Sequence, residues 1–132
     1  MRYRLLYRIQ FKEGFNFDNI DNHWSEEDLV IRDVYRAYVS EQIHHVYNGT
    51  KHRVDRSDEE VPVGFLVYNF ETEEAATNFW EQCMGDFNAP QIRNYQMVLR
   101  KNMLNIERYT VRLEEMVDGG FRVIKVLKNI EF

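Results

Sequence analysis

The chain has 132 residues, a formal net charge of −5, 44% hydrophobic residues and 14% aromatic residues. This composition is typical of an ordered globular protein, and the length predicts a single domain over residues 1–132. The single cysteine excludes an intrachain disulfide and any zinc site built from cysteines. Since no stretch reaches about 18 consecutive apolar residues and arginines interrupt the apolar N-terminal segment, we expect a cytoplasmic protein without a membrane span.

The N-terminal segment predicts a strand with one buried face. From Tyr3 to Phe11, every second residue is apolar. Such alternation indicates a strand that packs one face on a core and exposes the other. The positions of the opposite parity hold Arg2, Arg4, Leu6 and Arg8. We therefore expect a basic strand face, followed by a loop over residues 12–23.

A long helix is predicted after this loop. Ser25 with Asp28 three positions later approximates a capping box, and Asn48-Gly49 supplies the helix end. Tyr38 lies on the apolar stripe of this helix. Residues 50–60 are almost entirely polar or charged, and we expect them to form a solvated loop.

A buried strand and a second helix come next. Residues Val61–Phe70 are nearly all apolar, which indicates a strand covered on both faces. Thr72 is the predicted N-cap of the helix, and Gly85 its predicted end. This strand–helix passage, from Val61 to Cys83, resembles the equivalent step in dimeric α+β barrels.

The last third of the chain contains one ambiguous segment and one clear hairpin. Residues 90–106 fit either a strand over 93–100, which we favour, or a helix that starts at Pro90. Residues 108–132 form two alternating runs joined by Asp118-Gly119-Gly120, a pattern that predicts a β-hairpin.

The expected order of elements is therefore β-α-β-α-β-β-β. A single layer of antiparallel or mixed sheet with two helices on one face would bury these half-apolar strands. The predicted class is α+β, with a ferredoxin-like or related architecture.

Charge is distributed unevenly along the chain. Residues 1–12 contain four basic and no acidic residues, whereas residues 13–90 contain five basic and seventeen acidic ones. If the N-terminal strand pairs near the hairpin, Arg2, Arg4 and Arg8 share a sheet face with Arg112. A basic face with tyrosines nearby would suit single-stranded RNA. The acidic helical surface would repel a phosphate backbone, so nucleic acid is the least favoured partner.

No motif indicates chemistry. The chain has no phosphate-binding loop and no nucleophile elbow, and the four histidines lack the spacing of a metal site. Cys83 lies in an apolar stripe, as a buried small hydrophobe does. We expect no catalytic residue, no metal and no cofactor, and we leave open whether the protein is an enzyme.

Three functions remain open. The leading hypothesis is a non-catalytic interaction module, a homo-oligomeric accessory protein whose partner is another copy of itself or a different protein. The first alternative is a small-ligand-binding protein or enzyme of the dimeric α+β barrel type, and the second is RNA binding. In the first alternative, an acidic or aromatic molecule would be held in a cavity between sheet and helices by Tyr7, Tyr35, Tyr38 and Tyr68. The candidate ligand- or partner-binding residues are Arg2, Arg4, Leu6, Arg8, Arg112 and Tyr38.

Overall fold

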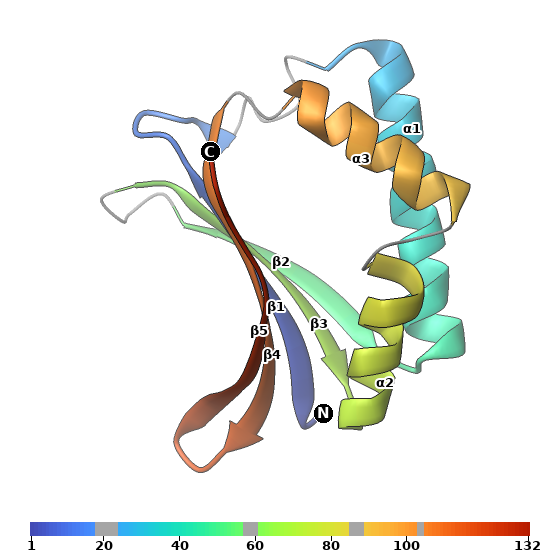
Figure 1. Ribbon diagram of the computed structural model, residues 1–132, viewed down its shortest axis with the longest axis vertical. Helices are drawn as coiled ribbons and strands as arrows, with labels where there is room; N and C mark the ends of the chain where they lie inside the picture. The colour runs from blue at the N-terminus through green and yellow to red at the C-terminus, as the bar shows by residue number, and fades with distance from the viewer. Residues whose placement is uncertain (18–23, 57–60, 85–88, 103–104) are drawn as a thin grey trace.

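The computed structural model describes residues 1–17, 24–56, 61–84, 89–102 and 105–132. Within these residues the chain has an α+β fold made of one five-stranded antiparallel sheet and three α-helices, two of which continue into a π-helical turn (Figure 1). In chain order the elements are β1 (Tyr3–Phe11), α1 (Glu26–Glu41), η2 (Gln42–Val46), β2 (Thr50–Arg56), β3 (Val63–Phe70), α2 (Glu73–Phe79), η3 (Trp80–Met84), α3 (Pro90–Asn102), β4 (Ile106–Val117) and β5 (Gly120–Glu131).

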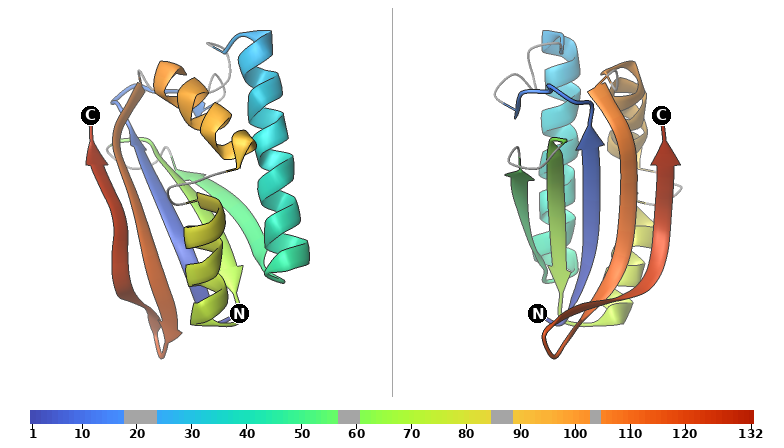
Figure 2. Two further views of the ribbon diagram at one scale, coloured as in Figure 1. Left: turned by 45° about the vertical axis from the view of Figure 1, so that its right-hand side comes forward. Right: turned by 90° about the vertical axis from the view of Figure 1, so that its left-hand side faces the viewer.

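The strands lie in the order β2-β3-β1-β4-β5, and every neighbouring pair is antiparallel. The helices all lie on one side of this sheet, and Figure 2 shows the other side bare, facing the viewer in its right-hand view. We call the two sides the helix face and the open face. No helix among the described residues is long and apolar enough to cross a membrane.

The centre of the sheet supplies the core on the helix face. Leu5 on β1 lies opposite Tyr68 on β3 and opposite Leu113 on β4, and all three are buried. Because side chains alternate along a strand, the odd-numbered positions of β1 point to the helices. The prediction of a half-buried strand from Tyr3 to Phe11 is confirmed, as is the C-terminal hairpin.

Both predicted helix starts are confirmed. The Asp28 N–H donates to Ser25 Oγ at 3.1 Å, and the Ala75 N–H donates to Thr72 Oγ1 at 3.1 Å. These bonds satisfy backbone donors that the first turn of a helix leaves open. The predicted helix end at Gly85 lies outside the described residues.

The preferred strand over residues 93–100 is wrong, because this segment is part of α3. Pro90 occupies the first helical position, where its fixed φ and missing N–H cost nothing. Ile92 is buried, and the ring of Tyr95 stacks on that of Tyr35. Met97 alternates with Tyr95 and Leu99 in the sequence, as apolar residues of a strand would. It is 69% exposed on the outer side of the helix.

The predicted loop over residues 50–60 is also wrong in its first part, which is strand β2. β2 is an edge strand, paired only with β3. An edge strand gains its backbone hydrogen bonds from a single neighbour. Its other edge is free, and charged side chains such as those of Lys51, Arg53 and Asp55 are common on edge strands because they hinder pairing with a further strand. Residues 57–60 lie outside the described part of the chain.

Candidate functional site

The structure brings four of the predicted site residues together on the open face. Leu6 on β1 lies opposite Arg112 on β4, and Arg4 and Arg8 are its neighbours of the same parity. Arg2 is exposed and precedes β1, where its carbonyl accepts a hydrogen bond from the Met116 N–H at 2.7 Å. Arg4, Leu6, Arg8 and Arg112 thus share one sheet face by strand register, whereas Arg2 lies outside the strand.

Two of these arginines are engaged in contacts within the face. Arg4 Nε donates to Glu114 Oε1 at 2.7 Å, and the Glu114 residue is only 4% exposed. The Arg4 guanidinium also lies 3.4 Å from the centroid of the Phe121 ring. Arg8 Nη1 donates to Gln10 Oε1 at 3.1 Å. The positive charge of Arg4 is therefore balanced locally by Glu114.

The strand tyrosines lie on the opposite side. Tyr3, Tyr7, Tyr68 and Tyr109 all occupy helix-face positions of β1, β3 and β4, and they pack in or against the core. The open-face arginines therefore have no tyrosine beside them to serve as a base-stacking platform, which RNA binding by this face was expected to use.

The helix face contains a concave site. A cavity of about 430 Å³ lies between the sheet and helices α1 and α3. A second cavity of about 460 Å³ adjoins it and shares part of its wall, namely Tyr35, Tyr95, Leu99 and Tyr109. Both volumes fall within the range of small-molecule sites. The tyrosines that line the first cavity are Tyr7, Tyr35, Tyr68, Tyr95 and Tyr109.

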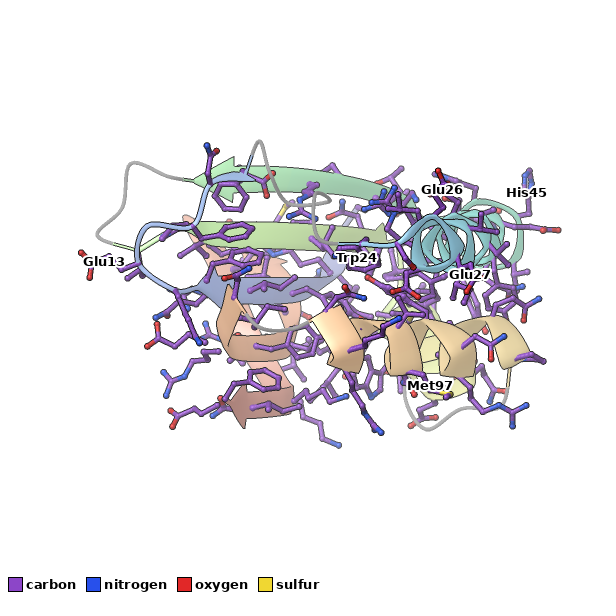
Figure 3. The ribbon with its side chains drawn as sticks, turned by 90° about the horizontal axis from the view of Figure 1, so that it is seen from above. Glu13, Trp24, Glu26, Glu27, His45 and Met97 are labelled. Atoms are coloured by element: carbon purple, nitrogen blue, oxygen red, sulfur yellow. The ribbon has the colours of Figure 1, made fainter. Side chains whose placement is uncertain are left out.

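Three adjacent strands provide the floor of this cavity. Tyr7 on β1 lies between Tyr68 on β3 and Tyr109 on β4, with ring centroids 5.2 Å and 6.0 Å away. The helices provide the roof, because Tyr35 on α1 and Tyr95 on α3 stack with centroids 3.9 Å apart. Figure 3 shows Trp24 between the sheet and α1, whereas Glu26, His45 and Met97 lie outside this space. The aromatic wall thus comes from five separate elements of the chain.

The Tyr7 hydroxyl is the unusual group in this wall. Tyr7 is 2% exposed, and its hydroxyl has no hydrogen-bond partner among the residues that the structure describes. A buried hydroxyl without a partner costs about 1–3 kcal/mol. Burial also raises the pKa of Tyr7 well above its ordinary value, so the hydroxyl is protonated at neutral pH and available to donate.

Tyr35, Tyr68 and Tyr109 are neutral for the same reason. Burial raises the pKa values of Tyr35, Tyr68 and Tyr109 well above 10.0. Tyr35 Oη also contacts Met84 Sδ at 3.7 Å. None of these hydroxyls can act as a base near neutral pH, and all can hydrogen-bond to a ligand.

Among the described residues, the polar side chains that line the cavities are basic apart from Gln96 and the tyrosine hydroxyls. The first cavity is lined by Arg36 of α1 and by Lys51, His52 and Arg53 of β2, and the second by Arg93, Arg100 and Lys128. No aspartate or glutamate lines either cavity within the described ranges. In a chain of net charge −5, this selective lining creates a local positive potential.

Tyr38 is not part of this wall. It is half-buried on α1, and burial together with the neighbouring Cys83 raises its pKa. Cys83 is itself 2% exposed, its Sγ donates to Gln42 Oε1 at 3.7 Å, and burial raises its pKa, as expected of a packed thiol. Of the four tyrosines expected around a cavity, three line it and Tyr38 does not.

Three lining residues, Tyr95, Lys51 and Arg53, were not predicted from the sequence. Tyr95 lies in the segment for which we favoured a strand. Lys51 and Arg53 lie in the segment that was expected to form a loop. The alternative prediction, a helix that starts at Pro90, would have placed Ile92, Tyr95 and Leu99 on one side. It would therefore have predicted a helix covering the cavity.

No cluster of histidine, cysteine, aspartate and glutamate suited to a metal ion occurs among the described residues. Comparison of the chain with protein-family models, with curated proteins and with solved structures finds no match.

Proposed function

We propose that this protein binds a small aromatic molecule in the tyrosine-lined cavity of its helix face. The observation that carries the proposal is a cavity of about 430 Å³ lined by five tyrosines, one of which, Tyr7, has a buried hydroxyl without a partner among the described residues. A ligand group that accepts a hydrogen bond there would supply the missing partner. The surrounding rings would offer edge and face contacts to a planar molecule.

The proposed activity is binding rather than catalysis. General acid–base chemistry needs groups whose pKa values lie near the working pH, whereas burial moves those of the wall tyrosines upward, away from neutrality. The β2-β3-β1-β4 order supports a ferredoxin-like sheet with β5 added at one edge. In this interpretation the cavity occupies the place where the helices cover the sheet.

The test is isothermal titration calorimetry with 2-naphthol, a planar hydroxyl-bearing probe. Leu66→Trp and Leu99→Trp each place a larger side chain in the cavity wall, and we expect each to weaken binding by about tenfold or more. Met97→Trp adds the same ring on the exposed side of α3 and should leave affinity unchanged. Circular dichroism identifies variants that fold. No binding by the wild type, or equal binding by folded cavity-filling variants, contradicts the proposal.

Tyr7→Phe removes the hydroxyl and keeps the ring, so it tests the contribution of the hydroxyl alone. Because the hydroxyl has no partner in the part of the chain that the structure describes, its removal should leave the free protein as stable as the wild type or more stable. The same change should weaken 2-naphthol binding by several-fold. Loss of stability without loss of affinity would show that the hydroxyl serves the fold.

Self-association through the open face is the second candidate, and exposed apolar side chains favour it. Met116, Phe121, Val123 and Val126 are 48%, 39%, 42% and 54% exposed. By strand register all four lie on the open face, at its hairpin side. Apolar groups gathered on an uncovered sheet face are typical of a contact surface between proteins.

A further inference from the structure

Two cations line the tyrosine-lined cavity from different layers of the fold. Arg36 comes from α1 and Lys51 from the edge strand β2, and both belong to the wall of the 430 Å³ cavity. Neither has a carboxylate partner among the described residues. Arg53, by contrast, donates from Nε to Asp55 Oδ1 at 2.8 Å. The two unpaired cations are therefore the groups available to a ligand at this end of the cavity.

Arg36 and Lys51 are close enough to influence one another. The pKa of Lys51 is lowered first by burial and then by the positive charge of Arg36. Lys51 is exposed as a residue, and the charge of Arg36 acts on its ammonium with no compensating carboxylate among the described residues. An anion placed between the two groups would remove this repulsion and would gain charge-assisted hydrogen bonds from both.

The same cations lie beside the aromatic wall. Lys51 on β2 pairs with Tyr68 on β3, and the positive charge of Arg36 partly offsets the rise in the pKa of Tyr68 that burial causes. A molecule whose ring rests among Tyr35, Tyr68 and Tyr95 would thus present a substituent to Arg36 and Lys51.

We propose that the ligand of the cavity is an aromatic oxyanion, a carboxylate or a phosphate, whose negative group binds between Arg36 and Lys51. This inference rests on the proposed function and adds the charge of the ligand to it. The guanidinium of Arg36 provides a planar donor set that matches either oxyanion, and the Lys51 ammonium provides a point charge.

The second cavity supplies the internal comparison. Arg93, Arg100 and Lys128 line it, and Lys128 Nζ lies 5.9 Å from the centroid of the Tyr109 ring. An anion bound there would depend on Arg93 rather than on Arg36. Arg93→Gln therefore removes from the adjoining cavity the same charge that Arg36→Gln removes from the first, and it is a matched control.

The test compares 2-naphthol, 2-naphthoate and 2-naphthyl phosphate by calorimetry near neutral pH. These probes share one ring system and differ in charge, and we expect at least one anionic probe to bind about tenfold more tightly than 2-naphthol, as charged hydrogen bonds predict. The two anionic probes tell a carboxylate from a phosphate. Arg36→Gln and Lys51→Gln should each abolish the preference, whereas Lys51→Arg and Arg93→Gln should retain it.

Each other outcome has a definite meaning. If none of the three probes binds, the proposed function fails together with this inference. If 2-naphthol binds as tightly as both anions, the cavity binds aromatic molecules and only the inference fails. If the preference is lost in Arg93→Gln and kept in Arg36→Gln and Lys51→Gln, the anion binds in the second cavity and the inference is overturned.

Discussion

Tyr35 and Tyr95 join the two helices that roof the cavity. Their ring centroids are 3.9 Å apart at an interplanar angle of 24°, and both residues line both of the large cavities. The stack is therefore a partition as well as a contact between α1 and α3. Its position implies that the packing of the helices and the shape of the binding space depend on the same two rings.

Removing one ring of this stack should weaken the fold and merge the two cavities. We expect Tyr95→Ala to lower the free energy of unfolding by about 1–3 kcal/mol, because it deletes a stacked, half-buried ring. Met97→Ala, on the exposed side of the same helix, should change it by less than about 0.5 kcal/mol. Urea denaturation measures both, and equal losses would show that the stack has no special role.

Ionisation of the buried tyrosines should limit stability at alkaline pH. The pKa values of Tyr7, Tyr35, Tyr68 and Tyr109 are raised well above 10.0 in the folded state. A raised pKa means that the stabilisation is complete below about pH 10 and is lost as pH rises through the folded value.

Spectrophotometric titration of tyrosinate provides the measurement. Of the eight tyrosines, these four should ionise only together with unfolding, as judged by circular dichroism. Reversible ionisation of more than four tyrosines in the folded protein would contradict the burial of the cavity wall.

The ion pair on the open face should be structural. Arg4→Met leaves the carboxylate of Glu114, a residue only 4% exposed, without its partner at 2.7 Å. We expect a loss of about 2 kcal/mol or more, because an unpaired charge at a poorly exposed site is costly. Thermal or chemical denaturation measures the change.

Arg122→Met provides the matched control. Arg122 contacts Glu115 at 2.8 Å, but the Arg122 side chain is 66% exposed. Its removal should cost less than about 1 kcal/mol. A similar loss in both variants would indicate that burial of Glu114 is energetically unimportant.

Asp28 should make the packing of α1 on α3 sensitive to acid. Its Oδ2 accepts from Asn102 Nδ2 at 3.1 Å and from Lys101 Nζ at 3.2 Å, and hydrogen bonding to Asn102 is the largest cause that lowers its pKa. A lowered pKa means that its stabilisation is present above the ordinary value of 3.8 and is lost as pH falls through the lowered value.

Asp28→Asn tests this contribution. The variant should be less stable than the wild type near neutral pH, and the difference should vanish in acid. Asp33→Asn changes an exposed carboxylate on the same helix and should have little effect at any pH. A stability difference for Asp28→Asn that is independent of pH would exclude the carboxylate as its cause.

Self-association, if it occurs, should depend on the hairpin side of the open face. Leu6 is half-buried between neighbouring strands, whereas Val126, opposite Arg112, is 54% exposed. We expect Val126→Glu to convert an oligomer to a monomer in sedimentation velocity, and Leu6→Glu to do so as well if the interface reaches the centre of the face. Val34→Glu, at a 50% exposed site on α1, is the control. A wild-type monomer would exclude this candidate.

Local sequence patterns correctly predicted several elements of the fold. The alternation in β1, the Gly-containing hairpin turn and the caps at Ser25 and Thr72 all specify local structure directly. Tyr7 followed from the alternation in β1, because it assigns each strand residue to a face. Tyr68 lies in the nearly all-apolar run Val61–Phe70, which predicted a strand but assigned none of its residues to a face.

The remaining part of the site depends on tertiary context. β2 has almost no apolar pattern that would predict a strand. Its strand conformation comes from backbone pairing with β3. The segment of α3 contains both a period-2 and a helical pattern, and only packing against α1 decides between them. That Arg36 and Lys51 meet no carboxylate among the described residues could not be predicted either, because it depends on which residues of distant elements lie at one cavity.

The most direct test of the cavity is an NMR titration of the labelled protein with 2-naphthoate. We predict that the aromatic signals of Tyr35, Tyr68 and Tyr95 and the side-chain signal of Arg36 shift on binding, whereas the methyl signals of Leu6 and Val126 on the open face do not. Shifts confined to the open face, or no shift at saturating probe, would contradict ligand binding in the tyrosine-lined cavity.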